Sequence, residues 1–286
     1  MEVIRIPRIM QSTSKNLLVK VKTIGLVPTM GALHDGHLSL VRRSKEENDV
    51  TVVSIFVNPI QFGPAEDFDR YPRDIDGDTE KLSKAGVDIL FMPAVHAVYP
   101  EGFSTGVEVE GVSSRLCGAF RPGHFRGVAT VVAKLFNIIR PARAYFGAKD
   151  FQQTVVIQRM AKDLDMDTGV IVCPTIREKD GLAMSSRNAY LEPAQRKAAG
   201  VIFRCLTETS DLIKSGIIDG LYLRKVMIEK LGKEPAVTTI DYAGVYDPVL
   251  LDELSEIKGD VLIAIALKIG NTRLIDNMLV SLSKGR

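Results

Sequence analysis

The stretch that decides the fold runs over residues 24–44 and reads IGLVPTMGALHDGHLSLVRRS. Its apolar start indicates a buried strand, and its later part predicts a helix over residues 34–48. Residues three apart on a helix share one face, so His34 and His37 are expected to point together at one ligand. A helix N-terminus favours phosphate, and Gly36 lets a flat group approach the backbone.

Outward from this stretch, strand-like and helix-like segments alternate. Strands are expected over 50–57, 88–92, 144–146 and 169–173, and helices over 79–85, 128–139 and 151–164. Such alternation implies crossover connections and a parallel sheet. The carboxyl ends of parallel strands meet at one sheet edge. The motifs that begin at Met30, Asn58 and Gly147 should therefore cluster there.

The pattern changes after residue 176. Helices are expected over 192–215 and 221–231, and then strands over 238–246, 260–267 and 272–278 with no helix between them. Consecutive strands indicate a small antiparallel sheet. We therefore expect an α/β chain with a Rossmann-like parallel-sheet domain over 1–176. A smaller C-terminal α+β domain over 177–286 would follow a hinge at Arg177–Gly181.

The bulk composition is that of an ordinary globular chain. Hydrophobic residues make up 45% and charged residues 25% of the 286 residues, and the net charge of +2 gives no case for nucleic acid or membrane as a partner. The N-terminus lacks a signal-peptide core. The three cysteines are odd in number and far apart, which indicates a reducing cytoplasm and no disulfide framework.

Polar motifs follow several expected strands. Gln61 in FVNPIQF has an amide that can donate and accept hydrogen bonds. In RPGHFRG, residues 121–127, two arginines precede a helix; the motif is either an anion grip or a surface turn. Asp78 is expected to favour the dipole of a helix N-terminus.

Two further motifs carry groups suited to a nucleotide. In FGAKDFQQ, Lys149 suits phosphate, and Asp150 suits either a helix cap or a ribose hydroxyl. Only one of the two following glutamines can face the sheet edge well. In GLAMSSRN, two hydroxyls and Arg187 can surround a triphosphate, although the motif alone is an ordinary serine-rich turn.

Together these motifs resemble the pantoate–β-alanine ligase family, within the nucleotidylyl-transferase superfamily that carries a His-x-Gly-His signature. PTMGALHDGH, FVNPIQF, YPRD, RPGHFRGV, FGAKDFQQ and GLAMSSRNAYL occur in the family's order and spacing. The resemblance implies condensation of pantoate with β-alanine through a pantoyl adenylate, releasing AMP and pyrophosphate. It also implies Mg²⁺ with ATP as co-substrate, a homodimer, and no nucleic-acid or membrane partner.

The resemblance also implies residue roles. The catalytic set would be His37 as acid, His34, Lys149 and Arg187. ATP would be bound by Met30, Gly31, Ala32, Leu33, His34, Asp35, Gly36, His37, Gly147, Ala148, Lys149, Asp150, Ile176, Met184, Ser185, Ser186 and Arg187. Gln61 would contact pantoate and β-alanine, Gln153 would contact pantoate, and no metal ligand is assigned. Ala148 and Cys117 depart from the residues that the family often has, and Cys117 leaves local loop contacts open.

Two alternatives are kept. One is an adenylyl- or cytidylyl-transferase that acts on a phosphorylated metabolite; the neutral amides of Gln61 and Gln153 argue against it. The other is an inactive ATP-binding or dimerisation module; intact His34, His37, Lys149 and Arg187 argue against that. A zinc site fits poorly, because protein zinc sites need three or four ligands.

Overall fold

The computed structural model describes residues 1–64 and 66–282, and the chain divides into two compact units. The first unit comprises residues 1–113, 121–148 and 153–175. The second comprises residues 114–120, 149–152 and 176–286, of which the described part ends at residue 282. Each unit has its own sheet.

The first unit is built on a six-stranded parallel sheet in the order β1-β4-β3-β2-β5-β6. Its strands are β1 (Glu2–Ile4), β2 (Ile24–Thr29), β3 (Val50–Ile55), β4 (Ile89–Phe91), β5 (Arg143–Gly147) and β6 (Gly169–Cys173). Its helices are α1 (Pro7–Val19), α2 (Asp35–Glu47), α3 (Ile75–Lys84), α4 (Val95–Val98) and α6 (His124–Ile139), with α7 (Phe151–Asp163) beginning at the boundary of the units. This topology confirms the predicted Rossmann-like sheet.

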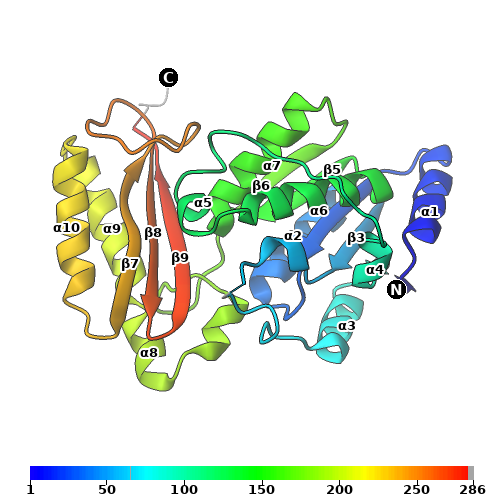
Figure 1. The fold of residues 1–286 in the computed structure, drawn as a ribbon, viewed down its shortest axis with the longest axis horizontal. Coiled ribbons are helices and arrows are strands. Elements are labelled where there is room, and N and C mark those ends of the chain that lie inside the picture. Colours follow the sequence, from blue (N-terminus) through cyan, green and yellow to red (C-terminus); the bar gives the residue numbers. More distant parts are fainter. Residues whose placement is uncertain (65, 283–286) are drawn as a thin grey trace. The chain divides into compact units, whose positions relative to one another are not determined.

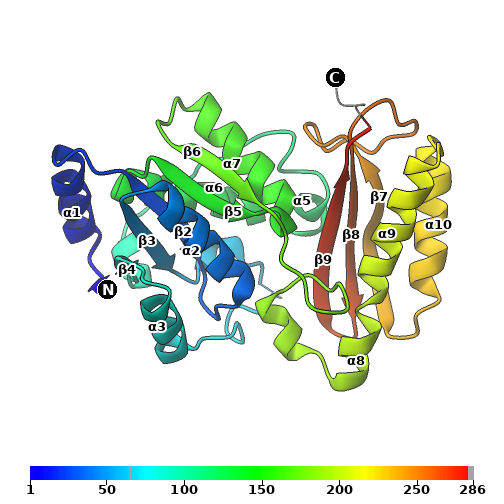
Figure 2. The same ribbon diagram turned by 180° about the vertical axis from the view of Figure 1, so that it is seen from behind.

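Helices cover both faces of this sheet. Helix α2 lies in front of the strands in Figure 2, and α6 lies in front of them in Figure 1. Helix α2 approaches β2 closely at Gly25, where an added Cβ would lie 2.6 Å from Asn48 Nδ2. The interior strands β2 and β3 are almost wholly buried, as expected of parallel strands covered on both faces.

The second unit contains a three-stranded antiparallel sheet, as the sequence predicts. Its strands are β7 (Val237–Tyr246), β8 (Val261–Ile269) and β9 (Thr272–Val280). Its helices are α5 (Cys117–Phe120), α8 (Pro193–Ala198), α9 (Val201–Lys214) and α10 (Gly220–Gly232). Helix α10 packs on β7, and α9 packs on β8 and β9, so the two helices and the sheet enclose an apolar core.

Some boundaries differ from the predictions. The sequence pattern did not indicate β1 or α1. The helix expected over 192–215 is two helices, α8 and α9, which meet at Ala199–Gly200. Helix α3 begins at Ile75 instead of residue 79, because the Asp74 side chain accepts from Gly77 N–H at 3.0 Å and caps it.

Helix α6 begins at His124 instead of residue 128, directly after Gly123, whose φ of 81° places it in the left-handed region. No helix within the described residues has the length and apolarity needed to cross a bilayer.

Candidate active site

The turn after β2 is held in place by a buried carboxylate. Gly31 and Ala32 both have positive φ, at 85° and 51°. The N–H groups of Ala32 and Leu33 each donate to a different oxygen of Asp78, both at 2.7 Å, and Asp78 is 1% exposed. Asp78 does lie in the first turn of α3, but its oxygens bind a segment 45 residues earlier. Its main contact is therefore with the motif, beyond the helix-dipole role that the sequence suggested.

The two histidines cap the helix that follows. His34 is the N-cap of α2, and its Nδ1 accepts from Gly36 N–H at 3.2 Å. Nδ1 of His37 accepts in turn from His34 N–H at 3.4 Å, and the ring centroids are 4.1 Å apart. Their proximity thus comes from a capping box and not from two positions inside a helix. The Gly36 N–H, one of the N-terminal donors of α2, is taken by His34.

This capping fixes the tautomer of both neutral imidazoles. A backbone N–H can only donate, so the Nδ1 atoms of His34 and His37 must be unprotonated acceptors. The ring proton of each therefore resides on Nε2. Both rings consequently offer an Nε2–H donor edge, which suits phosphate oxygens.

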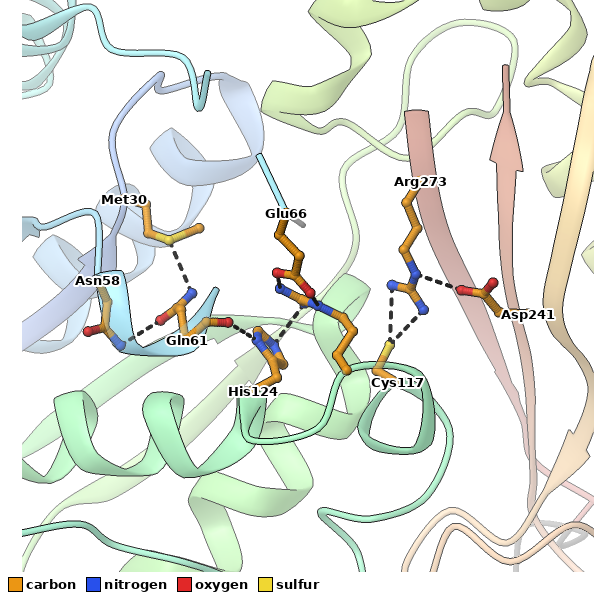
Figure 3. Close-up of polar contacts among 9 residues, drawn as sticks. Met30, Asn58, Gln61, Glu66, Cys117, His124, Asp241 and Arg273 are labelled. Atoms are coloured by element: carbon orange, nitrogen blue, oxygen red, sulfur yellow. Dashed lines mark hydrogen bonds and ion pairs between the residues drawn. The ribbon is translucent and has the colours of Figure 1, made fainter. Parts of the chain in front are cut away.

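Asn58 and Gln61 follow β3 in the short helix η1 (Pro59–Gln61) and are both buried. Gln61 Oε1 accepts from Asn58 Nδ2 at 3.0 Å, and Gln61 Nε2 contacts Met30 Sδ at 3.2 Å (Figure 3). Asn58 is itself held by the Tyr99 hydroxyl at 2.8 Å. The structure thus brings Gln61 together with Met30, as expected from the parallel topology. It also fixes which side of the Gln61 amide faces each neighbour.

A chain of polar contacts runs from Glu66 through Arg121 and His124 to the backbone of Gln61. Glu66 forms a bidentate ion pair with Arg121 at 2.7 and 2.5 Å, and Arg121 Nη1 lies 3.0 Å from His124 Nε2. His124 Nδ1 lies 2.8 Å from the Gln61 carbonyl oxygen (Figure 3). Burial tends to raise the pKa of Glu66, but Arg121 holds that pKa below its usual value. Arg121, the first arginine of RPGHFRG, therefore pairs with a carboxylate of the same chain.

At the end of β5, a Cβ added to Gly147 would meet nothing within 4 Å, so this backbone is open. Of the adjacent glutamines, Gln152 is buried and bonds to the backbone of Cys117 and Arg115, at 2.9 and 2.6 Å. Gln153 is only half-buried. The two glutamines therefore have different surroundings, and Gln153 stays the predicted substrate contact.

The second unit holds the remaining predicted residues. Lys149 is largely buried, with its side chain 19% exposed, and its Nζ lies 3.8 Å from Asp150 Oδ1. Met184 N–H donates to the Ile176 carbonyl oxygen at 3.0 Å. Ser185 caps the short helix η3 (Ser186–Tyr190), its Oγ accepting from Arg187 N–H at 3.3 Å. The serine-rich segment is thus a capped turn rather than an extended loop.

Cys117 also lies in the second unit. Its Sγ is 3.1 Å from the Tyr242 hydroxyl and 3.6 Å from Arg273 Nη2, and Arg273 pairs with Asp241 at 2.7 Å (Figure 3). Burial raises the pKa of Tyr242 well above its usual value. This network answers the question that the sequence left open about Cys117, because the thiol is a buried structural partner of Arg273.

The predicted residues thus fall into two sets, each defined within its own unit. The first contains Met30, Gly31, Ala32, Leu33, His34, Asp35, Gly36, His37, Gln61, Gly147, Ala148 and Gln153. The second contains Lys149, Asp150, Ile176, Met184, Ser185, Ser186 and Arg187. Sequence reasoning missed the bonds of Asp78 to residues 32–33 and the role of Glu66, because both act on partners distant along the chain.

Comparison with known proteins supplies the family. The model of the family described as pantoate-beta-alanine ligase matches residues 2–279. The chain belongs to this family. A pantothenate synthetase from Thermodesulfovibrio yellowstonii is 58% identical over 98% of this chain and 100% of its own length. One from Acetivibrio thermocellus is 55% identical over 94% of both chains.

Solved structures agree with the family assignment. A crystal structure of pantothenate synthetase from Thermus thermophilus superposes with a TM-score of 0.92 at 44% identity, covering 97% of this chain and 99% of that one. A pantoate-beta-alanine ligase from Francisella tularensis, complexed with beta-gamma ATP and beta-alanine, gives a TM-score of 0.80 at 36% identity. It covers 98% of this chain and 97% of that one.

Proposed function

We propose that this chain uses ATP to condense pantoate with β-alanine, forming pantothenate, AMP and pyrophosphate. The observation that carries this proposal is the family match over residues 2–279. The chain is accordingly a ligase that forms a C–N bond, in the pathway of pantothenate and coenzyme A biosynthesis.

The reaction has two balanced steps. A pantoate carboxylate oxygen attacks the α-phosphorus of ATP, the bond to the bridging oxygen breaks, and pyrophosphate leaves. The β-alanine amine then attacks the acyl carbon of pantoyl adenylate, loses a proton, and AMP leaves with the former carboxylate oxygen. Little covalent work is required of the protein beyond positioning and stabilising charge.

In the first unit, His34 and His37 would supply the donors for this chemistry. Their Nε2–H groups, fixed by backbone capping of Nδ1, suit the phosphate oxygens of ATP. His37 would act as the acid that stabilises the departing pyrophosphate. The rest of the segment from Met30 to Gly36, together with Gly147 and Ala148, would hold the nucleotide.

In the second unit, Lys149 and Arg187 would neutralise phosphate charge during the reaction. The side chains of Ser185 and Ser186, with Met184, would contact the phosphates. Asp150 and Ile176 would hold the nucleoside. The capped turn that carries Ser185 keeps these groups in a defined conformation, which favours preorganised electrostatic stabilisation.

Gln61 would contact pantoate and β-alanine, and Gln153 would contact pantoate. The amide of Gln61 is held between Asn58 and Met30, so its remaining hydrogen-bonding capacity has a fixed direction. Neutral amides suit a hydroxy acid better than a phosphate ester. This favours the ligase over a nucleotidylyl-transferase that acts on a phosphorylated metabolite.

We propose residues 1–176 as the domain that binds nucleotide and pantoate, and residues 177–286 as a lid domain. A lid that excludes water would protect the acyl adenylate from hydrolysis. The compact units differ from these boundaries by including residues 114–120, residues 149–152 and Ile176 with the later part of the chain.

Mg²⁺ would accompany ATP. In the described part of the chain, no group of three or more His, Cys, Asp or Glu side chains is arranged to hold a metal ion. Mg²⁺ commonly keeps several waters and binds through substrate phosphates, so this donor set fits an ion that ATP brings. The ion would neutralise phosphate charge.

We further propose a homodimer in the cytoplasm. Strand β6 lies at one edge of the parallel sheet, and its Val172 is 37% exposed, so this edge offers one surface for association. All three cysteines are unpaired thiols, which fits a reducing compartment. Light scattering should give a mass about twice 31.4 kDa.

Two experiments test the two-step mechanism, the first without β-alanine and the second with it. The purified protein should exchange labelled pyrophosphate into ATP only when pantoate is present. With ¹⁸O in the pantoate carboxylate and β-alanine added, one label should appear in AMP. Exchange that is independent of pantoate, or AMP without label, would overturn the acyl-adenylate mechanism.

A further inference from the structure

Asp276 on β9 is a buried carboxylate in the second unit. It is 2% exposed and pairs with Arg177 through both oxygens, at 2.6 and 3.1 Å. The Arg177 guanidinium also lies over the Phe203 ring, 4.6 Å from its centroid. Burial raises the pKa of Asp276 above its usual value, although Arg177 and the charge of Lys149 oppose this shift. A bidentate, stacked arginine has one well-defined position.

Buried ion pairs add little net stability compared with apolar residues of similar size, because desolvation offsets the attraction. Such pairs do fix the positions of the two side chains. The role of this pair therefore depends on the groups that Arg177 holds in place, more than on the free energy of the pair itself.

Arg177 holds the turn that leads into the serine-rich segment. Its Nη1 donates to the Gly181 carbonyl oxygen at 3.0 Å, and its backbone bridges to Ala183 across the turn. Gly181 has a φ of 88°, and an added Cβ there would overlap the Phe203 ring. The turn is thus held between β9 and α9. The segment that begins at Met184 follows directly after it.

The next residue on β9 holds a different segment. Asn277 Nδ2 donates to the Lys149 carbonyl oxygen at 2.8 Å, and Asn277 N–H donates to Asp276 Oδ1 at 2.8 Å. Successive side chains on a strand point to opposite faces of the sheet. One dipeptide can therefore hold two segments that are far apart in sequence, and the bond between its residues couples them.

We propose that Asp276 and Asn277 are positioning residues that set Lys149 and the segment Met184–Arg187 in one register for nucleotide binding. The inference rests on the proposed function of Lys149 and that segment. Neither residue is assigned any contact with substrate. Asp276 acts through Arg177, and Asn277 acts through the Lys149 backbone.

The test compares Asp276→Asn with Asp241→Asn. Both aspartates lie in the same sheet and pair with an arginine, and their side chains are 1% and 9% exposed, but Asp241 pairs with Arg273 and holds neither nucleotide segment. Asp276→Asn should lower kcat/KM for ATP by about 10- to 100-fold, since displacements near 1 Å can cost about that much. KM for β-alanine should stay within about twofold. Asp241→Asn should lower the melting temperature without moving KM for ATP.

Asn277→Leu provides the second variant, because it retains the size of the side chain and keeps the Asp276 pair. It should lower kcat/KM for ATP in a protein with wild-type circular dichroism. Wild-type ATP kinetics in Asn277→Leu, or an equal loss in Asp241→Asn, would overturn the inference. The proposed function fails separately, if the wild-type protein itself forms no pantothenate.

Discussion

Replacing Gly127 by alanine tests whether the position of Gln61 controls pantoate binding. Gly127 lies in α6 against η1, and its carbonyl oxygen accepts from Asn58 Nδ2 at 3.0 Å. An added Cβ would lie 2.6 Å from Gln61 Cα and 2.7 Å from Gln61 N. The nearest contact would be with the Ile60 carbonyl oxygen, and ordinary Cβ contacts begin near 3.4 Å, so the two backbones must separate by about 1 Å.

That separation sets the size of the expected effect. A displacement near 1 Å in a positioning group can cost about 10²-fold in rate. We therefore expect kcat/KM for pantoate to fall by about 30- to 100-fold. Overpacking of this kind costs about 1–3 kcal/mol, which corresponds to a loss of about 2–10 °C in melting temperature. Steady-state kinetics with varied pantoate, together with thermal unfolding, measure both quantities.

Gly232→Ala is the matched control. Gly232 is the last residue of α10, and an added Cβ there would meet nothing within 4 Å. This variant should keep wild-type kinetics with an equal or slightly higher melting temperature. A folded Gly127→Ala protein with wild-type kcat/KM for pantoate would refute the assignment of Gln61 as a pantoate ligand.

Three further predictions concern His37, Asp78 and Asp49. His37→Ala should lose about 10²- to 10⁴-fold in pantothenate formation, as expected for an acid, with an unchanged circular dichroism spectrum; wild-type turnover would exclude the assigned role. Asp78→Asn places an amide donor against the N–H groups of residues 32–33, so KM for ATP should rise and stability should fall by about 1–3 kcal/mol; unchanged ATP kinetics would mean that Asp78 does not shape the motif. Bonds from Thr23, and then Lys22, lower the pKa of Asp49 to about 2, so its stabilising effect is present above pH 4 and is lost as pH falls toward 2. Asp49→Asn should flatten the stability profile in that window, and an unaltered acid limb in urea titrations would contradict the assignment.

Local patterns were enough to predict most of the fold. The buried runs of β2 and β3 and the strand Gly169–Cys173 indicated a parallel sheet, because alternating strands and helices leave few other arrangements. The sequence also predicted that Met30 and Gln61 lie close together at the carboxyl edge of this sheet, and the two side chains are in contact. Strand β1 escaped detection because it has only three residues, and α1 because only Met10 and Ser14 of its 13 residues are buried, which leaves a weak apolar periodicity.

Long-range polar contacts were not predictable in this way. Asp78 has the pattern of a helix N-terminal acid, and its bonds to residues 32–33 depend on tertiary folding. Arg121 has the pattern of an anion grip, but its partner is Glu66, 55 residues earlier. Hydrophobic periodicity constrains which face is buried, whereas the partner of a buried charge depends on which loops meet in space.

The most direct test measures AMP and pantothenate formation by the purified protein from ATP, pantoate and β-alanine, with each substrate omitted in turn. AMP and pantothenate should form in equal amounts, and only when all three substrates are present. ATP binding without turnover, or a nucleotide-containing product formed from a phosphorylated metabolite with no amine required, would contradict it.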